Sequence, residues 1–143
     1  MRILAVDPGT KRVGLALSDP TATIASALVT VEADPSETLA ARLAAIAAAQ
    51  EAERVIVGLP RNLDGSRGPA AAAAERLATD LRKASKLPVE TVDERLTTVV
   101  ADRSLLAAGA TRRERRLAVD RVAATLLLQG YLDRMKSDKR RAG

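Results

Sequence analysis

Acidic residues stand at two positions where an α/β protein places its functional site. Asp7 ends an apolar segment near the N-terminus, and the adjacent Asp93 and Glu94 end a second such segment. Because the loops at the strand ends of an open α/β sheet converge on one edge, these carboxylates are candidates for a shared site. The alternative for Asp7 is an ordinary turn aspartate, since Asp7-Pro8-Gly9 is favourable turn chemistry.

Asp120 is a third candidate, in the last predicted helix. Helical periodicity puts it on the same face as Leu127 and Tyr131, with Ala123 and Ala124 close by. A carboxylate on an apolar face is costly unless a cation, hydrogen-bond donors or a metal ion compensates it. An ion pair with an arginine is one explanation. We favour metal ligation, because two other acidic positions already stand at strand ends.

The composition limits the chemistry that these residues can perform. The chain has no Cys and no His, which excludes thiolate nucleophiles, Ser-His triads and the common zinc sites. Carboxylates prefer hard divalent ions, so we expect Mg²⁺ or Mn²⁺. With one or two such ions, carboxylates can support hydrolysis of a phosphodiester bond without any histidine.

The charge balance favours an anionic partner. The 143 residues include 23 Lys and Arg against 18 Asp and Glu, a net charge of +5. Nucleic acid is the leading candidate, although a merely basic protein would have the same composition. With one Tyr and no Phe or Trp, the chain offers no stacking surface for unpaired bases. We therefore expect recognition of backbone and shape, in structured RNA or branched DNA.

Several polar and basic residues are candidates for contacts with nucleic-acid phosphates. They lie in the first turn, in a loop rich in Gly and Pro, beside the acidic pair, and in a basic stretch before the last helix. About half of them are expected to be ordinary surface cations. The candidates are Lys11, Arg12, Arg61, Asn62, Arg67, Arg95, Arg112, Arg113, Arg115 and Arg116.

Hydrophobic patterns and turn signals predict the elements that position these residues. We expect a hairpin and further strands, then alternating helices and strands, which together indicate an α/β fold with a mixed five-stranded sheet flanked by helices. The predicted strands are 3–7, 13–17, 25–31, 54–58 and 89–92, and the predicted helices are about 35–53, 69–86, 97–109 and 117–135. Residues 1–137 should form one domain, followed by a flexible basic tail at 138–143. No signal peptide or long apolar segment is present in this sequence, so we expect a cytoplasmic protein without membrane contact.

Four motifs together resemble those of the YqgF family, also called RuvX, in order and spacing along nearly the whole chain. This resemblance implies a ribonuclease H-like fold related to the junction resolvase RuvC. It implies a nuclease that matures the 5′ end of small-subunit (pre-16S) ribosomal RNA, and some members are described instead as resolvases of four-way (Holliday) DNA junctions. The motifs are Asp7-Pro8-Gly9-Thr10-Lys11-Arg12-Val13-Gly14, Val57-Gly58-Leu59-Pro60 with Asn62 and Asp64-Gly65, Asp93-Glu94-Arg95-Leu96-Thr97-Thr98, and Val119-Asp120 with Ala123-Ala124.

The resemblance implies that the catalytic residues and metal ligands are Asp7, Asp120 and one acid of the pair Asp93 and Glu94. We favour Glu94, with Asp93 as the alternative. Adjacent strand residues face opposite sides of a sheet, and the sequence does not say which side faces the site. The sequence departs from the broader ribonuclease H pattern at one point: the strand at 54–58 is followed by Leu59 and Pro60 without an acid. The number of metal ions is therefore left open.

Other functions are compatible with the same residues. Symmetric cutting of a four-way junction requires two active sites, so a homodimer would favour the resolvase; the alanine-rich helices from Ala40 and Ala70 could pack on a second copy. The turn after Asp7 also resembles the phosphate loop of actin-like ATP-binding phosphotransferases, which close two lobes where this chain has length for one. A third possibility is a nucleic-acid-binding module without catalysis.

Overall fold

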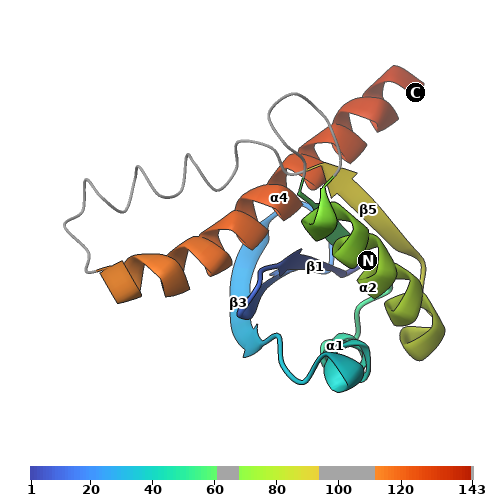
Figure 1. The fold of residues 1–143 in the computed structure, drawn as a ribbon. Coiled ribbons are helices and arrows are strands. Elements are labelled where there is room, and N and C mark those ends of the chain that lie inside the picture. The colour runs from blue at the N-terminus through green and yellow to red at the C-terminus, as the bar shows by residue number, and fades with distance from the viewer. Residues whose placement is uncertain (61–67, 94–111, 143) are drawn as a thin grey trace.

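The computed structural model describes the backbone of residues 1–60, 68–93 and 112–142, and the side chains of these residues except 112–121 and 139–142. Within them, a five-stranded sheet has the order β3-β2-β1-β4-β5 (Figure 1). The strands are β1 (Ile3–Pro8), β2 (Arg12–Ser18), β3 (Ala25–Glu32), β4 (Arg54–Leu59) and β5 (Val89–Asp93). Strands β1, β2 and β3 are antiparallel neighbours, whereas β4 is parallel to β1 and β5 to β4. The predicted mixed five-stranded sheet is confirmed.

The central strands are buried on both faces. Ile3 to Val6 in β1 and Val55 to Val57 in β4 have no exposed surface. Their apolar side chains alternate between two core clusters, one on each side of the sheet. This burial explains why both segments read as continuous apolar runs instead of alternating patterns.

A tight turn joins β1 to β2 and requires a glycine. The Gly9 amide donates to the Arg12 carbonyl oxygen over 2.9 Å. A Cβ atom added at Gly9 would lie 2.5 Å from that oxygen, a separation that side chains do not tolerate. The absence of a side chain therefore lets the hairpin close directly after Asp7 and Pro8.

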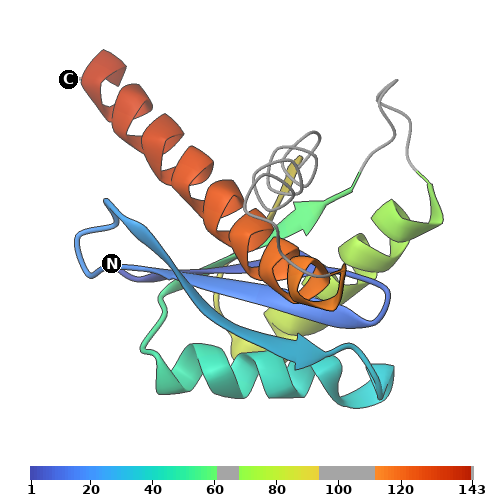
Figure 2. The same cartoon turned by 90° about the vertical axis from the view of Figure 1, so that its left-hand side faces the viewer.

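The helices form layers on both faces of the sheet (Figure 2). Helices α1 (Ser36–Ala49) and α2 (Pro69–Ser85) cover one face, where Leu4, Val6, Val55 and Val57 belong to the core. Helix α4 (Arg112–Ala142) crosses the other face diagonally and packs against Ile3, Ala5, Ala16 and Ile56. None of the helices in the described part of the chain combines the length and the apolar character that crossing a membrane requires.

The limits of two helices differ from the prediction. Helix α4 begins at Arg112 and ends at Ala142, so the predicted limits of 117 and about 135 were too narrow. Its additional turns consist largely of Arg, Lys and Glu, which favour helices, and contain no Pro or Gly. Helix α1 ends at Ala49, before the predicted end near 53, because Glu51 has a left-handed backbone conformation with φ of 58°. The predicted helix at 97–109 lies outside the described residues.

Candidate functional site

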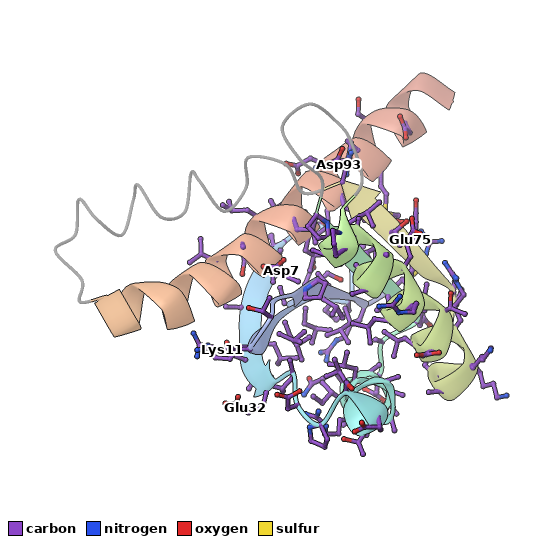
Figure 3. The ribbon with its side chains drawn as sticks, viewed as in Figure 1. Asp7, Lys11, Glu32, Glu75 and Asp93 are labelled. Atoms are coloured by element: carbon purple, nitrogen blue, oxygen red, sulfur yellow. The ribbon has the colours of Figure 1, made fainter. Side chains whose placement is uncertain are left out.

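Asp7 is the candidate site residue that the structure describes most fully. It is half-buried near the end of β1 and is paired with Gly14 of β2. Ile3 and Ala5 belong to the core cluster beneath α4, and strand alternation puts Asp7 on that same side of the sheet. Figure 3 shows Asp7 beside α4. Its carboxylate is therefore directed into the layer between sheet and helix.

Glycines flank Asp7 on both neighbouring strands. Gly14 is its partner on β2, and Gly58 follows Val57, which is the partner of Val6 on β4. Both glycines are buried, and alternation with Ala16 and Ile56 puts them on the α4 side of the sheet. Neither neighbouring strand thus adds a side chain next to the carboxylate. We call this place the glycine recess, formed by Asp7, Gly14 and Gly58.

The sequence analysis quoted Gly14 and Gly58 within motifs but assigned them no role. The available signal was a glycine inside each of two strand-like apolar segments. Glycine weakens a strand and often marks a close approach of a ligand to the backbone. That signal could have been used only once the strands were aligned, because the register brings both glycines to Asp7.

Asp93 ends β5 opposite Leu59 of β4 and is exposed. Val92 packs in the cluster beneath α4, whereas Val89 packs in the cluster on the α2 side. Alternation in a regular strand puts residues 89, 91 and 93 on the side of the sheet away from Asp7, although Asp93, at the end of this edge strand, also lines a cleft shared with α4. This arrangement disfavours Asp93 as a partner of Asp7 at one metal ion. Glu94, the other acid of the pair, lies outside the described residues.

Position 120 lies in the part of α4 whose backbone alone is described. Ala124, Leu127 and Tyr131 form the row that packs on the sheet, and each is at most 7% exposed. Position 120 continues this row by one turn toward the start of the helix. The first turns of α4 extend beyond the β3 edge of the sheet (Figure 1).

Helix α4 crosses the sheet diagonally, and toward its N-terminus it moves from the starts of β1 and β4 to the end of the sheet that holds Asp7 (Figure 2). Tyr131 contacts Arg54, the first residue of β4, which is paired with Ile3. From position 131 to 120 the helix covers ~16 Å at 1.5 Å per residue. From Ile3 to Asp7 the strand covers ~13 Å at 3.3 Å per residue. The helix therefore carries position 120 toward the end of β1 where Asp7 lies.

A cleft of about 380 Å³ lies between the β5 edge and the C-terminal half of α4. On its wall the Arg54 guanidinium donates to the Tyr131 hydroxyl over 2.9 Å, and this hydroxyl donates to Glu90 over 2.8 Å. Burial and the hydrogen bond to Glu90 raise the pKa of Tyr131, so the hydroxyl keeps its proton. The cleft is lined by Glu90, Thr91, Val92, Asp93, Tyr131, Arg134, Met135 and Asp138. Three of these lining residues are acidic and one, Arg134, is basic.

The structure describes only some of the residues predicted to contact nucleic-acid phosphates. Lys11 is exposed at the tip of the β1–β2 hairpin and lies away from Asp7, whereas Arg12 is half-buried in β2 (Figure 3). Arg112, Arg113, Arg115 and Arg116 lie in the first turns of α4. Arg61, Asn62, Arg67 and Arg95 lie outside the described residues.

The described residues fit an oxygen-coordinated metal ion but do not complete its site. Within the described ranges, no group of three or more acidic residues is close enough to hold an ion. Asp7 contributes a hard carboxylate ligand, and Gly14 and Gly58 add no side chain beside it. Of the other two predicted ligands, Glu94 lies outside the described residues, and only the backbone of Asp120 is described.

Comparisons with known proteins agree with this architecture. The RuvX family model, described as Holliday junction resolvase, matches residues 1–134. A Moorella thermoacetica protein named "Putative pre-16S rRNA nuclease" is 49% identical over 138 residues, covering 94% of this chain and 96% of the relative. A Chloroflexus aurantiacus protein of the same name is 41% identical over 140 residues, covering 98% of this chain and 92% of the relative.

Solved structures share the fold at low sequence identity. T. thermophilus RuvC in complex with a Holliday junction substrate has a TM-score of 0.59 at 17% identity, covering 95% of this chain and 96% of RuvC. The Fowlpox virus resolvase in complex with Holliday junction DNA has a TM-score of 0.56 at 14% identity, covering 94% of this chain and 99% of the resolvase. The predicted ribonuclease H-like fold is thereby confirmed. From the family match over residues 1–134 and the two close relatives, we conclude that this chain belongs to the RuvX family.

Proposed function

We propose that this protein is a metal-dependent endonuclease that hydrolyses nucleic-acid phosphodiesters in the maturation of the 5′ end of pre-16S ribosomal RNA. The observation that carries the proposal is the glycine recess, which holds a strand-end carboxylate beneath the helix that contains position 120. The substrate follows the name of the relatives that are 41% and 49% identical. Ribosomal RNA processing in turn suggests a cytoplasmic protein, with residues 1–137 as one nuclease domain.

The proposed ligands of Mg²⁺ or Mn²⁺ are Asp7, Glu94 and Asp120. Glu94 is preferred to Asp93, because strand alternation puts Asp93 on the side of the sheet away from Asp7. When bound, such an ion lowers the pKa of a coordinated water and offsets the negative charge of the phosphate. The carboxylates would hold the ion, and Gly14 and Gly58 allow the scissile phosphate to approach the backbone of β2 and β4 closely.

The basic residues are proposed to hold the substrate by its phosphates. The candidates whose backbone positions are described are Lys11 at the hairpin tip, Arg12 at the start of β2 and the cluster from Arg112 to Arg116 in α4. The remaining candidates are Arg61, Asn62, Arg67 and Arg95. Each phosphate contact releases counterions, so binding should weaken steeply as salt concentration rises.

Cleavage by the purified protein tests the proposal directly. A precursor 16S 5′ fragment and a synthetic four-way DNA junction are incubated in parallel with Mg²⁺, Mn²⁺ or EDTA. We expect RNA cleavage that requires the metal ion and is abolished by Asp7→Asn, which removes a ligand charge with little change of shape. Unchanged cleavage by Asp7→Asn would refute the metal site, and absence of cleavage of both substrates would favour a binding module.

Resolution of four-way junctions is the second candidate function. It is supported by the description of the family model and by the two structural neighbours in complex with Holliday junctions. Symmetric cutting needs two active sites related by a two-fold axis, so this function also predicts a homodimer. Preferential cleavage of the junction by a dimer in solution would select it over RNA maturation.

A further inference from the structure

Helix α4 packs on the sheet through an apolar interface. Ala123, Ala124, Leu127, Leu128 and Leu132 are each at most 4% exposed and pack in the core beneath the helix. Burial of apolar surface stabilises the contact strongly but without direction. Small alanines at the N-terminal end of this interface give few protrusions that would oppose a slide or a rotation.

Two polar side chains of α4 add directional hydrogen bonds between the helix and the sheet. The Gln129 amide accepts a hydrogen bond from the Ala25 amide over 2.9 Å and donates to the Thr23 carbonyl oxygen over 3.0 Å. This contact ties α4 to the start of β3, one edge strand of the sheet. The Tyr131 hydroxyl bridges Arg54 of β4 and Glu90 of β5, the strand at the other edge.

The two contacts restrain different movements of the helix. Residues 129 and 131 differ by about 200° around the helix axis, so their side chains leave it on nearly opposite sides. A rotation that preserved one set of hydrogen bonds would break the other. A slide along the axis would break both, since each bond is already near its ideal length.

Position 120 depends on these contacts because it shares a row with Tyr131. The separation of eleven positions corresponds to about three full helical turns, so the two backbone positions lie on the same side of the helix. Any rotation of α4 at Tyr131 is therefore transmitted to position 120. Metal coordination tolerates deviations of only about 0.2 Å in ligand distance, so a small rotation would disturb a ligand there.

We propose that Gln129 and Tyr131 are positioning residues that set the rotation and axial register of α4, and thereby the position of residue 120 relative to Asp7. This inference rests on the proposed metal-dependent nuclease function. It gives Tyr131, the only aromatic residue of the chain, a role away from the reacting atoms. Tyr131 acts through Glu90 and Arg54, without contact with the substrate.

The test compares Tyr131→Phe and Gln129→Met with the matched control Leu126→Gln. Phe and Met retain size and lose only the polar contacts, whereas Leu126 lies on the same helix and is 41% exposed. We expect Tyr131→Phe and Gln129→Met to reduce both the affinity for Mn²⁺ and kcat by ~10-fold or more, as loss of an outer-shell contact does. KM for the nucleic acid should stay within about twofold, because phosphate contacts are retained. Leu126→Gln should leave the affinity for Mn²⁺ and kcat unchanged.

A geometric readout separates this inference from the proposed function. The chain has no cysteine, so Asp7→Cys with Asp120→Cys introduces a single thiol pair that a short bifunctional thiol reagent can join. Tyr131→Phe or Gln129→Met should lower the yield of this crosslink, whereas Leu126→Gln should not. Circular dichroism identifies any variant that does not fold. If either Tyr131→Phe or Gln129→Met does not fold, the remaining variant is used for the test.

Crosslink yields, Mn²⁺ affinity and kcat that match the Leu126→Gln control would overturn the positioning role. A loss of Mn²⁺ affinity with an unchanged crosslink would overturn it as well, because the polar contacts would then act by another route. If the wild-type protein neither binds Mn²⁺ nor cleaves nucleic acid, the proposed function fails. The crosslink yields would still show whether these two residues fix the helix.

Discussion

Replacing Gly14 by alanine tests whether the space beside Asp7 must stay free of side chains. The register pairs Gly14 with Asp7, so the new methyl group would lie ~5 Å from the Asp7 Cβ atom, on the same side of the sheet. A methyl group there would occupy part of the glycine recess that a metal ion or a phosphate needs. The substitution leaves every proposed ligand and every basic side chain unchanged.

The expected effect on stability is small. Alanine in place of glycine in a strand favours folding by ~0.5–1 kcal/mol, because the unfolded chain loses conformational freedom. Crowding against a buried neighbour opposes folding by ~1–3 kcal/mol. The net change should therefore be a loss of at most ~2.5 kcal/mol, which a domain stable by ~5–15 kcal/mol survives at 25 °C.

The expected effect on catalysis is much larger. A displacement of ~1 Å in a catalytic arrangement can reduce the rate ~100-fold. We expect a loss of this size in single-turnover cleavage with saturating Mg²⁺, and weaker binding of Mn²⁺ measured separately. The matched control is Gly130→Ala, since a Cβ atom at Gly130 would meet nothing within 4 Å.

Thermal unfolding of both variants distinguishes a blocked site from a destabilised fold. If Gly14→Ala cleaves within about threefold of the wild-type rate, the recess does not have to remain open and the reasoning from register is refuted. If its activity is lost together with most of its folded population at 25 °C, the methyl group disturbs the sheet itself. Gly58→Ala should repeat the Gly14→Ala result from the β4 side, because Gly58 flanks the same carboxylate.

Three further predictions follow from described features. Glu94→Gln should reduce metal-dependent cleavage far more than Asp93→Asn, because alternation puts Asp93 away from Asp7; equal losses in a cleavage assay would contradict this. Gly130→Ala should raise the stability of α4 by about 1 kcal/mol and Tm by about 3–4 °C in calorimetry, and a lower Tm would show hidden crowding. Hydrogen bonds from Ile24, Thr21 and Thr23 lower the pKa of Asp19, so its stabilisation should be complete above about pH 4 and decline as pH falls further; a Tm difference between wild type and Asp19→Asn that does not shrink toward pH 2 would contradict this.

Much of the sheet was predictable because its central strands have a simple physical signature. Strands covered on both faces need apolar side chains on both, and the segments that became β1 and β4 have little else. The sharp turn after Asp7 was equally clear, since Pro8 and Gly9 favour it and Gly9 is required by its contact with Arg12. The prediction of Asp7 at a strand end followed from these two features.

The limits of α1 and α4 could not be read from the sequence. Glu51 adopts a left-handed conformation that usually indicates glycine, so the end of α1 carried no recognisable signal. The charged turns at both ends of α4 resemble a solvated tail in composition, because Arg and Lys favour helices and also occur in disordered segments.

The choice between Asp93 and Glu94 required a three-dimensional reference. A strand pattern states that neighbouring residues face opposite sides but does not say which side carries the site. Packing of Val89 and Val92 in different core clusters supplies that reference for β5. The role of Gly14 and Gly58 depended in the same way on the pairing of three strands, which no local pattern contains.

Tyr131 can serve as an intrinsic spectroscopic probe of this protein. The chain has one Tyr and no Trp or Phe, so all of its near-ultraviolet absorbance and emission from aromatic side chains arises at one place. That place is the junction of α4 with β4 and β5, where the hydroxyl donates to the Glu90 carboxylate. Undocking of α4 would expose the ring to water and break this bond, changing tyrosine emission and near-ultraviolet circular dichroism together. Attachment of the final helix can therefore be followed in real time, without a label, during folding and substrate binding.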